Sequence, residues 1–185
     1  MKTAYLDIET SYIGKYTDQR LFRDHKNHRI TILGLRLLDE KRDSFVQFIG
    51  EVISKTTLLS ALQGTDLIIT YNGRSIPDKV KGLIGFDFPV IAAQLGVVLD
   101  REFKHLDLCP ACWERGLWGG QKAIEQSLGL NRELLVKDGA WADITWKKYE
   151  ATRDDNLLKD LLKYNREDVF MLHHIQNALQ SRKRR

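Results

Sequence analysis

The hydrophobic pattern of the first half of the chain is that of β-strands. Apolar and polar residues alternate over several short runs, the spacing that places successive side chains on opposite faces of a sheet. A charged turn at 39–42 joins the second and third runs, and Asn72-Gly73 ends the fourth. The predicted strands are 3–9, 30–38, 43–49, 67–71 and 104–108.

Further along, apolar residues recur three and four positions apart, which is the spacing of one face of an α-helix. Gly64 and Gly96 each follow such a run and are suited to end a helix. The predicted helices are 56–63, 88–95, 121–128 and 154–180, and the last two are the clearest parts of a region after 108 that is expected to be helical throughout. Three successive strands, followed by strands that alternate with helices, predict an α/β fold in which a mixed five-stranded sheet has helices on both faces.

Length and composition indicate the number of domains and the class of protein. A length of 185 residues fits one domain with a buried core, and 43% hydrophobic with 29% charged residues exclude a disordered chain. We expect a single domain over 1–181 and a basic tail at 182–185.

The net charge of 29 − 25 = +4 comes from the four Lys and Arg residues of that tail, which leaves 25 basic and 25 acidic side chains elsewhere. Nucleic-acid binding therefore has to be inferred from a specific site rather than from a general basic surface.

No segment has the sequence of a membrane span or a secretory signal. The longest largely apolar stretch, 83–99, is interrupted by Asp87, Pro89 and Gln94 and is shorter than the roughly 20 residues of a membrane helix. No apolar signal region follows Met1. Two cysteines in such a chain indicate a reducing compartment, so we expect a cytoplasmic protein without membrane partners.

Acidic residues occur where the pattern predicts buried side chains. In the first strand, the period of two places Asp7 and Glu9 on one face. In the last helix, Asp168 lies within the apolar stripe one turn after Tyr164, so both side chains project the same way. Asp87 is a fourth candidate, at the start of the second predicted helix. Each acidic residue also has an explanation without a functional site. Asp7 and Glu9 could lie at an exposed strand end, Asp168 could be a hydrogen-bonded acid in the core, and Asp87 could cap a helix.

We expect these acids to meet, because the carboxyl ends of strands are where open α/β sheets bind ligands. Three or four carboxylates in one pocket repel one another unless they bind cations. Oxygen ligands select Mg²⁺ or Mn²⁺, and two such ions can stabilise the attacking and the leaving oxygen of a phosphoryl displacement. The sequence therefore predicts a two-metal site for phosphodiester hydrolysis.

Four segments together resemble the three exonuclease motifs of the DEDD 3′ to 5′ exonucleases. They are YLDIET (5–10), TYNG (70–73), FDFPVI (86–91) and YNREDV (164–169). A tyrosine four residues before the last aspartate resembles the DEDDy branch. The chain is most similar to the stand-alone predicted exonucleases related to the proofreading domain of family B DNA polymerases, and weaker similarity at 105–108, 122–130, Trp146 and Tyr149 extends this over nearly the whole chain. The resemblance implies a ribonuclease-H-like fold.

The resemblance also implies roles for the candidate residues. Asp7, Glu9 and Asp168 would hold the metal ion that binds the attacking water. Asp7 with Asp87, directly or through water, would hold the second ion near the leaving 3′ oxygen. Tyr164 would orient the water by a hydrogen bond, because a phenol with a pKa of about 10 is a poor base at neutral pH.

Thr10 and Asn72 are the candidate substrate-binding residues, although an Asn before Gly is also a common turn residue. The second motif departs from the family pattern, because residues 74–85 separate the Asn-Gly pair from Asp87. This insertion contains Asp78, which is the alternative second-motif acid. We prefer Asp87 because it leads into an apolar helix, whereas the sequence after Asp78 is typical of a loop.

The preferred function is a metal-dependent exonuclease that removes nucleotides from a 3′ end, with single-stranded DNA expected ahead of RNA. The alternatives are a ribonuclease-H-like endonuclease or RNA 3′-trimming nuclease, and a nucleic-acid-binding module without turnover.

The cysteines, tryptophans and the last two histidines are expected to have structural rather than functional roles. Cys109 and Cys112 lack a second cysteine pair for structural zinc. The four tryptophans have stacking on nucleobases as an alternative, but we expect them to pack helices together. His173 and His174 are expected on the surface of the last helix.

Overall fold

The computed structural model describes residues 1–13, 24–74, 76–78, 82–133 and 138–182, and of residues 76–78 and 82–84 it describes the backbone. Its strands are β1 (Thr3–Tyr12), β2 (His28–Leu38), β3 (Asp43–Ile49), β4 (Leu67–Thr70), β5 (Ile76–Asp78), β6 (Gly82–Ile84) and β7 (Lys104–Asp107). Its α-helices are α2 (Lys55–Ala61), α3 (Asp87–Leu95), α4 (Leu99–Glu102), α5 (Leu108–Trp113), α6 (Gln121–Leu128), α7 (Gly139–Thr152) and α8 (Asp155–Ser181). Short 3-10 helices cover His25–Asn27 and Gly50–Val52.

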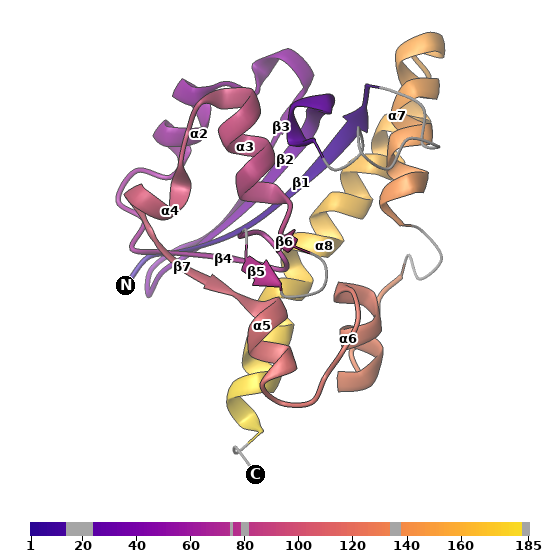
Figure 1. Ribbon diagram of the computed structural model, residues 1–185. Coiled ribbons are helices and arrows are strands. Elements are labelled where there is room, and N and C mark those ends of the chain that lie inside the picture. Colours follow the sequence, from indigo (N-terminus) through magenta and orange to yellow (C-terminus); the bar gives the residue numbers. More distant parts are fainter. Residues whose placement is uncertain (14–23, 75, 79–81, 134–137, 183–185) are drawn as a thin grey trace.

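Five strands form one mixed sheet in the order β3-β2-β1-β4-β7. β1 pairs antiparallel with β2 and parallel with β4, so it lies at the centre of the sheet (Figure 1). β2 pairs antiparallel with β3, and β4 pairs parallel with β7. The predicted α/β fold with a mixed five-stranded sheet is therefore confirmed.

Helices cover both faces of this sheet, and β1 contributes alternate side chains to each face. Leu6 and Ile8 pack with α2, α3 and α4 on one side. Tyr5 packs with α5, α6 and α8 on the other side, where the long helix α8 crosses the sheet (Figure 1). Because side chains alternate along a strand, Asp7 and Glu9 share the face of Tyr5 and point toward α8.

Most element boundaries agree with the sequence pattern within a few residues. α6 has the predicted bounds, and α8 begins after Asp154, whose side chain caps it. β1 is longer than predicted and continues to Tyr12, past a register irregularity between Glu9 and Thr10. The structure adds α4, and it gives bounds to α5 and α7 within the region that the sequence predicts as helical. α4 and α5 are too short for a helical period to show, and the apolar residues of α7 are spread around its axis.

The structure differs from two readings of the region around Asp87. Asp87 is the first residue of α3 and not its cap; the cap position belongs to Phe86, whose side chain makes no capping hydrogen bond. β5 and β6 pair as an antiparallel hairpin where the sequence suggests a loop. Strands of three residues are too short to give a recognisable alternation in the sequence. The backbone of Asp78 lies in this hairpin, opposite Gly82.

None of the described helices has both the length and the apolar composition needed to cross a membrane. Of the predicted basic tail, Arg182 is described and forms the C-terminal cap of α8. Residues 183–185 lie outside the described part of the chain. The division into one domain and a tail stays a prediction.

Candidate active site

β1 and α8 bring three carboxylates together beside the centre of the sheet. Asp7, Glu9 and Asp168 each offer a carboxylate oxygen, and these oxygens lie within 4.8 Å of one another. Glu9 and Asp168 are buried, at 6% and 7% exposure, and Asp7 is partly buried. The shared face of Asp7 and Glu9 follows from the strand period, as predicted, and the inward position of Asp168 follows from the apolar stripe of α8.

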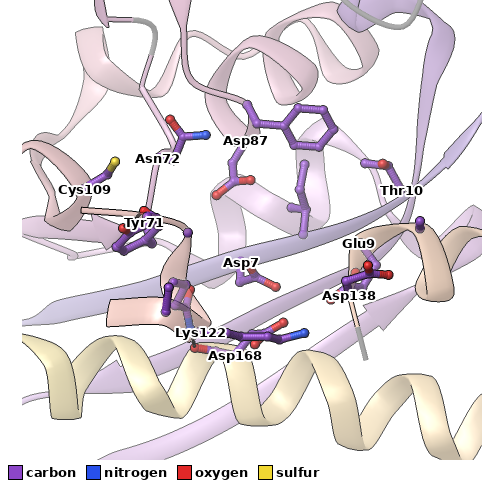
Figure 2. Close-up of a pocket in the computed structure, with 18 of the residues that line it drawn as sticks. Asp7, Glu9, Thr10, Tyr71, Asn72, Asp87, Cys109, Lys122, Asp138 and Asp168 are labelled. Atoms are coloured by element: carbon purple, nitrogen blue, oxygen red, sulfur yellow. Dashed lines mark hydrogen bonds between the residues drawn. The ribbon is translucent and has the colours of Figure 1, made fainter. Parts of the chain in front are cut away.

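Asp87 reaches the same place from the start of α3. It is 6% exposed and lines a cavity of about 1230 Å³ together with the other three acids. Figure 2 shows its carboxylate pointing toward Asp7 on β1, with Asp168 of α8 beyond it. The structure therefore brings all four sequence-predicted acids to one cavity. The side chain of the alternative, Asp78, lies outside the described part of the structure.

Burial raises the pKa of all four acids, and the charges of neighbouring acids add to the shift at Asp7, Glu9 and Asp87. Burial, followed by the charge of Asp168, raises the pKa of Asp7 well above its usual value. Burial, followed by the charge of Asp7, does the same for Glu9 and Asp87. Burial also raises the pKa of Asp168, although a neighbouring guanidinium opposes this shift. Ionised carboxylates are therefore costly here unless a cation compensates them.

This donor set fits hard divalent cations. Asp7, Glu9 and Asp168 supply oxygen atoms alone, they lie close enough to share one ion, and Asp87 approaches Asp7 from the opposite side of the cavity. Oxygen-only sites of this kind suit Mg²⁺ or Mn²⁺ rather than zinc. The geometry is thus consistent with a metal centre.

Tyr164 lies beside the acids as a neutral phenol. It is 4% exposed, and its hydroxyl oxygen accepts a hydrogen bond of 2.9 Å from Nζ of Lys122, which also lies 4.3 Å from the centre of the tyrosine ring. Burial, followed by the charge of Asp168, raises the pKa of Tyr164 above its ordinary value. The phenol therefore keeps its proton and acts as a hydrogen-bond donor.

Asn165 is a site residue that the sequence analysis missed. It is fully buried, and its Nδ2 atom donates to Oδ2 of Asp7 at 2.8 Å. Its Oδ1 atom accepts from Nε2 of Gln47 at 2.9 Å. Gly34 on β2 makes room for it, since a Cβ atom at that position would lie 2.3 Å from Oδ1 of Asn165. The sequence signal for Asn165 is its position three residues before Asp168, because residues three apart on a helix are neighbours on its surface.

Arg132 and Glu125 were also missed. The Arg132 guanidinium forms an ion pair with Asp168, and its Nε atom lies 2.7 Å from Oε2 of Glu125. The side chains of Arg132 and Glu125 are each 1% exposed. Burial opposes the charge of Arg132, but the charge and hydrogen bond of Asp168, together with the charges of Glu125 and Glu167, raise the pKa of Arg132. Gln121 adds a hydrogen bond from Nε2 to Oε1 of Glu125, at 3.0 Å.

The two predicted substrate-binding residues both line the cavity. Thr10 lies at one end, and its Oγ1 is 3.4 Å from Nδ1 of His28. Asn72 lies toward the other end (Figure 2), and its backbone N–H donates to Oδ1 of Asp107 at 2.8 Å. Its φ of 59° confirms the turn interpretation, because asparagine tolerates this left-handed conformation before glycine.

The cysteines have an ordinary structural role in the described part of the chain. Cys109 and Cys112 are free and buried in α5, and neither belongs to the group of three metal-ligating side chains that is described. Burial raises the pKa of both thiols to about 11. They are therefore protonated and unreactive at neutral pH.

Two expectations about surface and core residues are wrong. His174 is exposed as expected, but His173 is half-buried, because it packs against Tyr5 and lies 3.0 Å from a guanidinium nitrogen of Arg36. Trp141 and Trp146 pack between α7 and α8 as expected. Trp118, in contrast, is exposed, because it occupies the loop between α5 and α6.

The comparisons with known proteins agree with this geometry. A search of curated proteins finds no matching relative. A family model described as the RNase_H superfamily matches residues 4–180, a span that runs from β1 to the end of α8 and contains all four acids. This match covers nearly the whole sequence, including the strands of the mixed sheet and the acids on β1 and α8. The chain therefore belongs to the ribonuclease H superfamily.

Proposed function

We propose that this protein is a metal-dependent 3′ to 5′ exonuclease of the DEDDy type, which hydrolyses phosphodiester bonds at the 3′ end of single-stranded DNA. The observation that carries the proposal is the approach of the Asp7, Glu9 and Asp168 carboxylate oxygens to within 4.8 Å of one another. The neutral phenol of Tyr164 beside them supports the DEDDy assignment. Membership of the ribonuclease H superfamily supports a nuclease in general.

In this proposal the acids bind the metal ions and the phenol directs the reacting water. Two divalent ions, Mg²⁺ or Mn²⁺, would supply the positive charge that lowers the pKa of a water molecule and stabilises the leaving 3′ oxygen. Asp7, Glu9 and Asp168 would hold one ion, and Asp7 with Asp87 would hold the other. Arg132 and Asn165 fix the carboxylates of Asp168 and Asp7 through the contacts described above.

Tyr164 positions the water through its hydroxyl group. Because Lys122 donates to the hydroxyl oxygen, the O–H hydrogen points away from the lysine and is available for a second partner. We propose that during the reaction the same hydrogen is donated to the attacking water or to the phosphate. Tyr164→Phe should then lower the rate of cleavage without weakening metal binding.

The direct test uses oligonucleotides of DNA and RNA that carry a 5′ label, incubated with Mg²⁺ or Mn²⁺. A ladder of products that shortens by single nucleotides from the 3′ end supports the proposal. Internal cuts would indicate an endonuclease, faster shortening of RNA would indicate an RNA-trimming enzyme, and binding without cleavage would indicate a non-catalytic module. The Asp7→Asn variant and added EDTA should each abolish the ladder.

A second pair of variants decides the second-motif acid. Asp87→Asn should abolish cleavage, because Asp87 lines the cavity with Asp7 and Asp168. Asp78→Asn should retain activity. The opposite result would assign the metal-binding role to Asp78.

We further propose that the protein acts on nucleic-acid 3′ ends in the cytoplasm. The two free, buried cysteines support a reducing compartment. Fractionation of cells followed by immunoblotting of the full chain tests this location.

A further inference from the structure

Trp118 is an exposed aromatic side chain in the loop between α5 and α6. Its side chain is 68% exposed, and of the six large apolar residues that are exposed within the described ranges, it is the one that lines the cavity of the candidate active site. Aromatic side chains usually stabilise a fold by burying roughly 150–250 Å² each. Because Trp118 is mostly exposed, it contributes little of this stabilisation, and packing of the core does not explain its position.

Trp118 is stacked on a second indole. The rings of Trp113 and Trp118 are nearly parallel, with 19° between their planes and 5.8 Å between their centroids. Trp113 is partly buried at the end of α5 and lines the same cavity. Trp113 therefore supports one side of Trp118, while most of the Trp118 side chain remains open to solvent.

The backbone on both sides of Trp118 is held by hydrogen bonds. Before it, the Leu117 N–H donates to the carbonyl of Cys112 at 3.0 Å. After it, the Gly119 carbonyl accepts a 2.6 Å hydrogen bond from the hydroxyl of Tyr71, another cavity residue. Gly119 has a φ of 127°, which an L side chain rarely adopts, so glycine is required for this path. The indole is thus presented on a fixed loop, which lowers the entropic cost of binding a ligand to it.

We propose that Trp118, backed by Trp113, is a stacking platform for an unpaired nucleobase of the strand whose phosphodiester bond is cleaved at the candidate metal centre. This inference rests on the proposed function and gives a physical basis for its single-stranded substrate. A base in a duplex has its faces covered by its neighbours, whereas an unpaired base offers a flat face. The cavity of about 1230 Å³ exceeds the roughly 300–1,000 Å³ typical of sites for single small molecules, so it has room beyond the reacting group.

The distribution of charge makes stacking on Trp118 important for the affinity for nucleic acid. Residues 1–181 contain 25 basic and 25 acidic side chains, so the body of the protein has no excess positive charge to attract the phosphate backbone. Six of the acids line the cavity itself. Stacking on an aromatic ring does not depend on net charge and typically strengthens binding by roughly 5- to 150-fold per base. We therefore assign a substantial part of the affinity for single strands to Trp118.

The experiment measures binding in a protein that does not cleave. The full chain with Asp7→Asn is titrated with a 5′-labelled single-stranded oligonucleotide, and the dissociation constant is obtained from fluorescence anisotropy. Adding Trp118→Ala should raise the Kd by roughly 5- to 150-fold, whereas Trp118→Phe should raise it less, because a phenyl ring still stacks. Val52→Ala is the matched control, since Val52 is 59% exposed but does not line the cavity.

A substrate without bases tests whether the contact is to a nucleobase. On an oligonucleotide with abasic sites at its last three positions, Trp118→Ala should have no effect on the Kd. The proposal is overturned if Trp118→Ala leaves the Kd for the ordinary strand unchanged, or if it weakens the abasic strand equally. An unchanged Tm of Trp118→Ala, which we expect for an exposed side chain, shows that any loss of affinity is local.

Cleavage is measured separately, so that the two proposals can fail independently. The p-nitrophenyl ester of thymidine 5′-monophosphate contains one phosphodiester bond and lacks a neighbouring base. Trp118→Ala should lose activity on oligonucleotides through a raised KM, whereas Val52→Ala should cleave both substrates at the parental rate. If the parent protein cleaves neither substrate, the proposed function fails, and the binding experiment still decides the platform.

Discussion

Asn165 of α8 donates a hydrogen bond of 2.8 Å to the carboxylate of Asp7 on β1. Asp7 pairs with Gly34 across the sheet, and the missing side chain of Gly34 creates the space that the Asn165 amide occupies. A second hydrogen bond, from Gln47 on β3, fixes the other end of this amide. The orientation of one candidate metal ligand therefore depends on three strands and the last helix.

Gly34→Ala should disturb this arrangement. The new Cβ atom would lie 2.3 Å from Oδ1 of Asn165 and 2.9 Å from Cγ2 of Val169, so α8 or the amide must shift. We expect a loss of stability of about 1–3 kcal/mol in urea unfolding and weaker Mn²⁺ binding by calorimetry. In the double variant Gly34→Ala/Asn165→Ala, the clash with the amide is removed, and the loss should be smaller than the sum of the single losses. Additive losses would contradict this explanation.

Asp7→Asn and Asp168→Asn should affect the metal-free protein differently. Asp7→Asn removes one of several mutually repelling carboxylates, so the Tm in EDTA should rise. Asp168→Asn removes repulsion too, but it also removes an ionic partner of the buried Arg132, so its Tm should rise less or fall. Calorimetry of both variants in EDTA is the measurement. An equal or larger gain for Asp168→Asn would show that the ion pair contributes nothing. Both variants should lose the rise in Tm that Mn²⁺ gives the wild type.

The stability of the metal-free protein should fall as the pH rises. Because the pKa values of Asp7, Glu9 and Asp87 are raised in the folded state, the folded protein binds more protons than the unfolded chain. This contribution is complete below the ordinary carboxylate pKa of about 4 and is lost as the pH rises through the raised values. In EDTA, the Tm of the wild type minus that of Asp7→Asn should therefore decrease with pH. With saturating Mn²⁺ the ionised carboxylates are neutralised, and the decrease should disappear; parallel curves would count against the metal site.

Arg132→Met should destabilise the protein strongly. It leaves Glu125 buried at 1% exposure without its guanidinium partner, a loss of about 3–5 kcal/mol for pairs of this kind. The double variant Arg132→Met/Glu125→Gln removes both charges and should recover most of the stability. Urea unfolding of the three proteins measures this. In the recovered double variant, Mn²⁺ affinity should still differ from that of the wild type, because Asp168 has lost the group that holds it; an unchanged affinity would limit Arg132 to a structural role.

The sequence predicts the parts of this site that depend on local periodicity. Asp7 and Glu9 share a face because a strand has a period of two, and Asp168 points inward because it interrupts an apolar stripe. Arg132 and Lys122 could not be found in this way. They come from α6 and the segment after it, and their contacts with α8 depend on how α6 packs in three dimensions.

The remaining differences have similar causes. The hairpin of β5 and β6 is too short to produce a recognisable pattern. Trp118 looks like a core residue by its chemistry, and its exposure follows from the path of the loop between α5 and α6. His173 faces the sheet because Tyr5 and Arg36 offer it polar and aromatic contacts that a helical projection does not include.

The position of the candidate ligands at opposite ends of the chain has a consequence during synthesis on the ribosome. β1 emerges first with Asp7 and Glu9, whereas Asp168 follows only when α8 is translated. Until α8 docks, the early strand lacks both the third carboxylate and the amide of Asn165. A nascent chain therefore carries an incomplete set of ligands until α8 has been synthesised and has docked on the sheet.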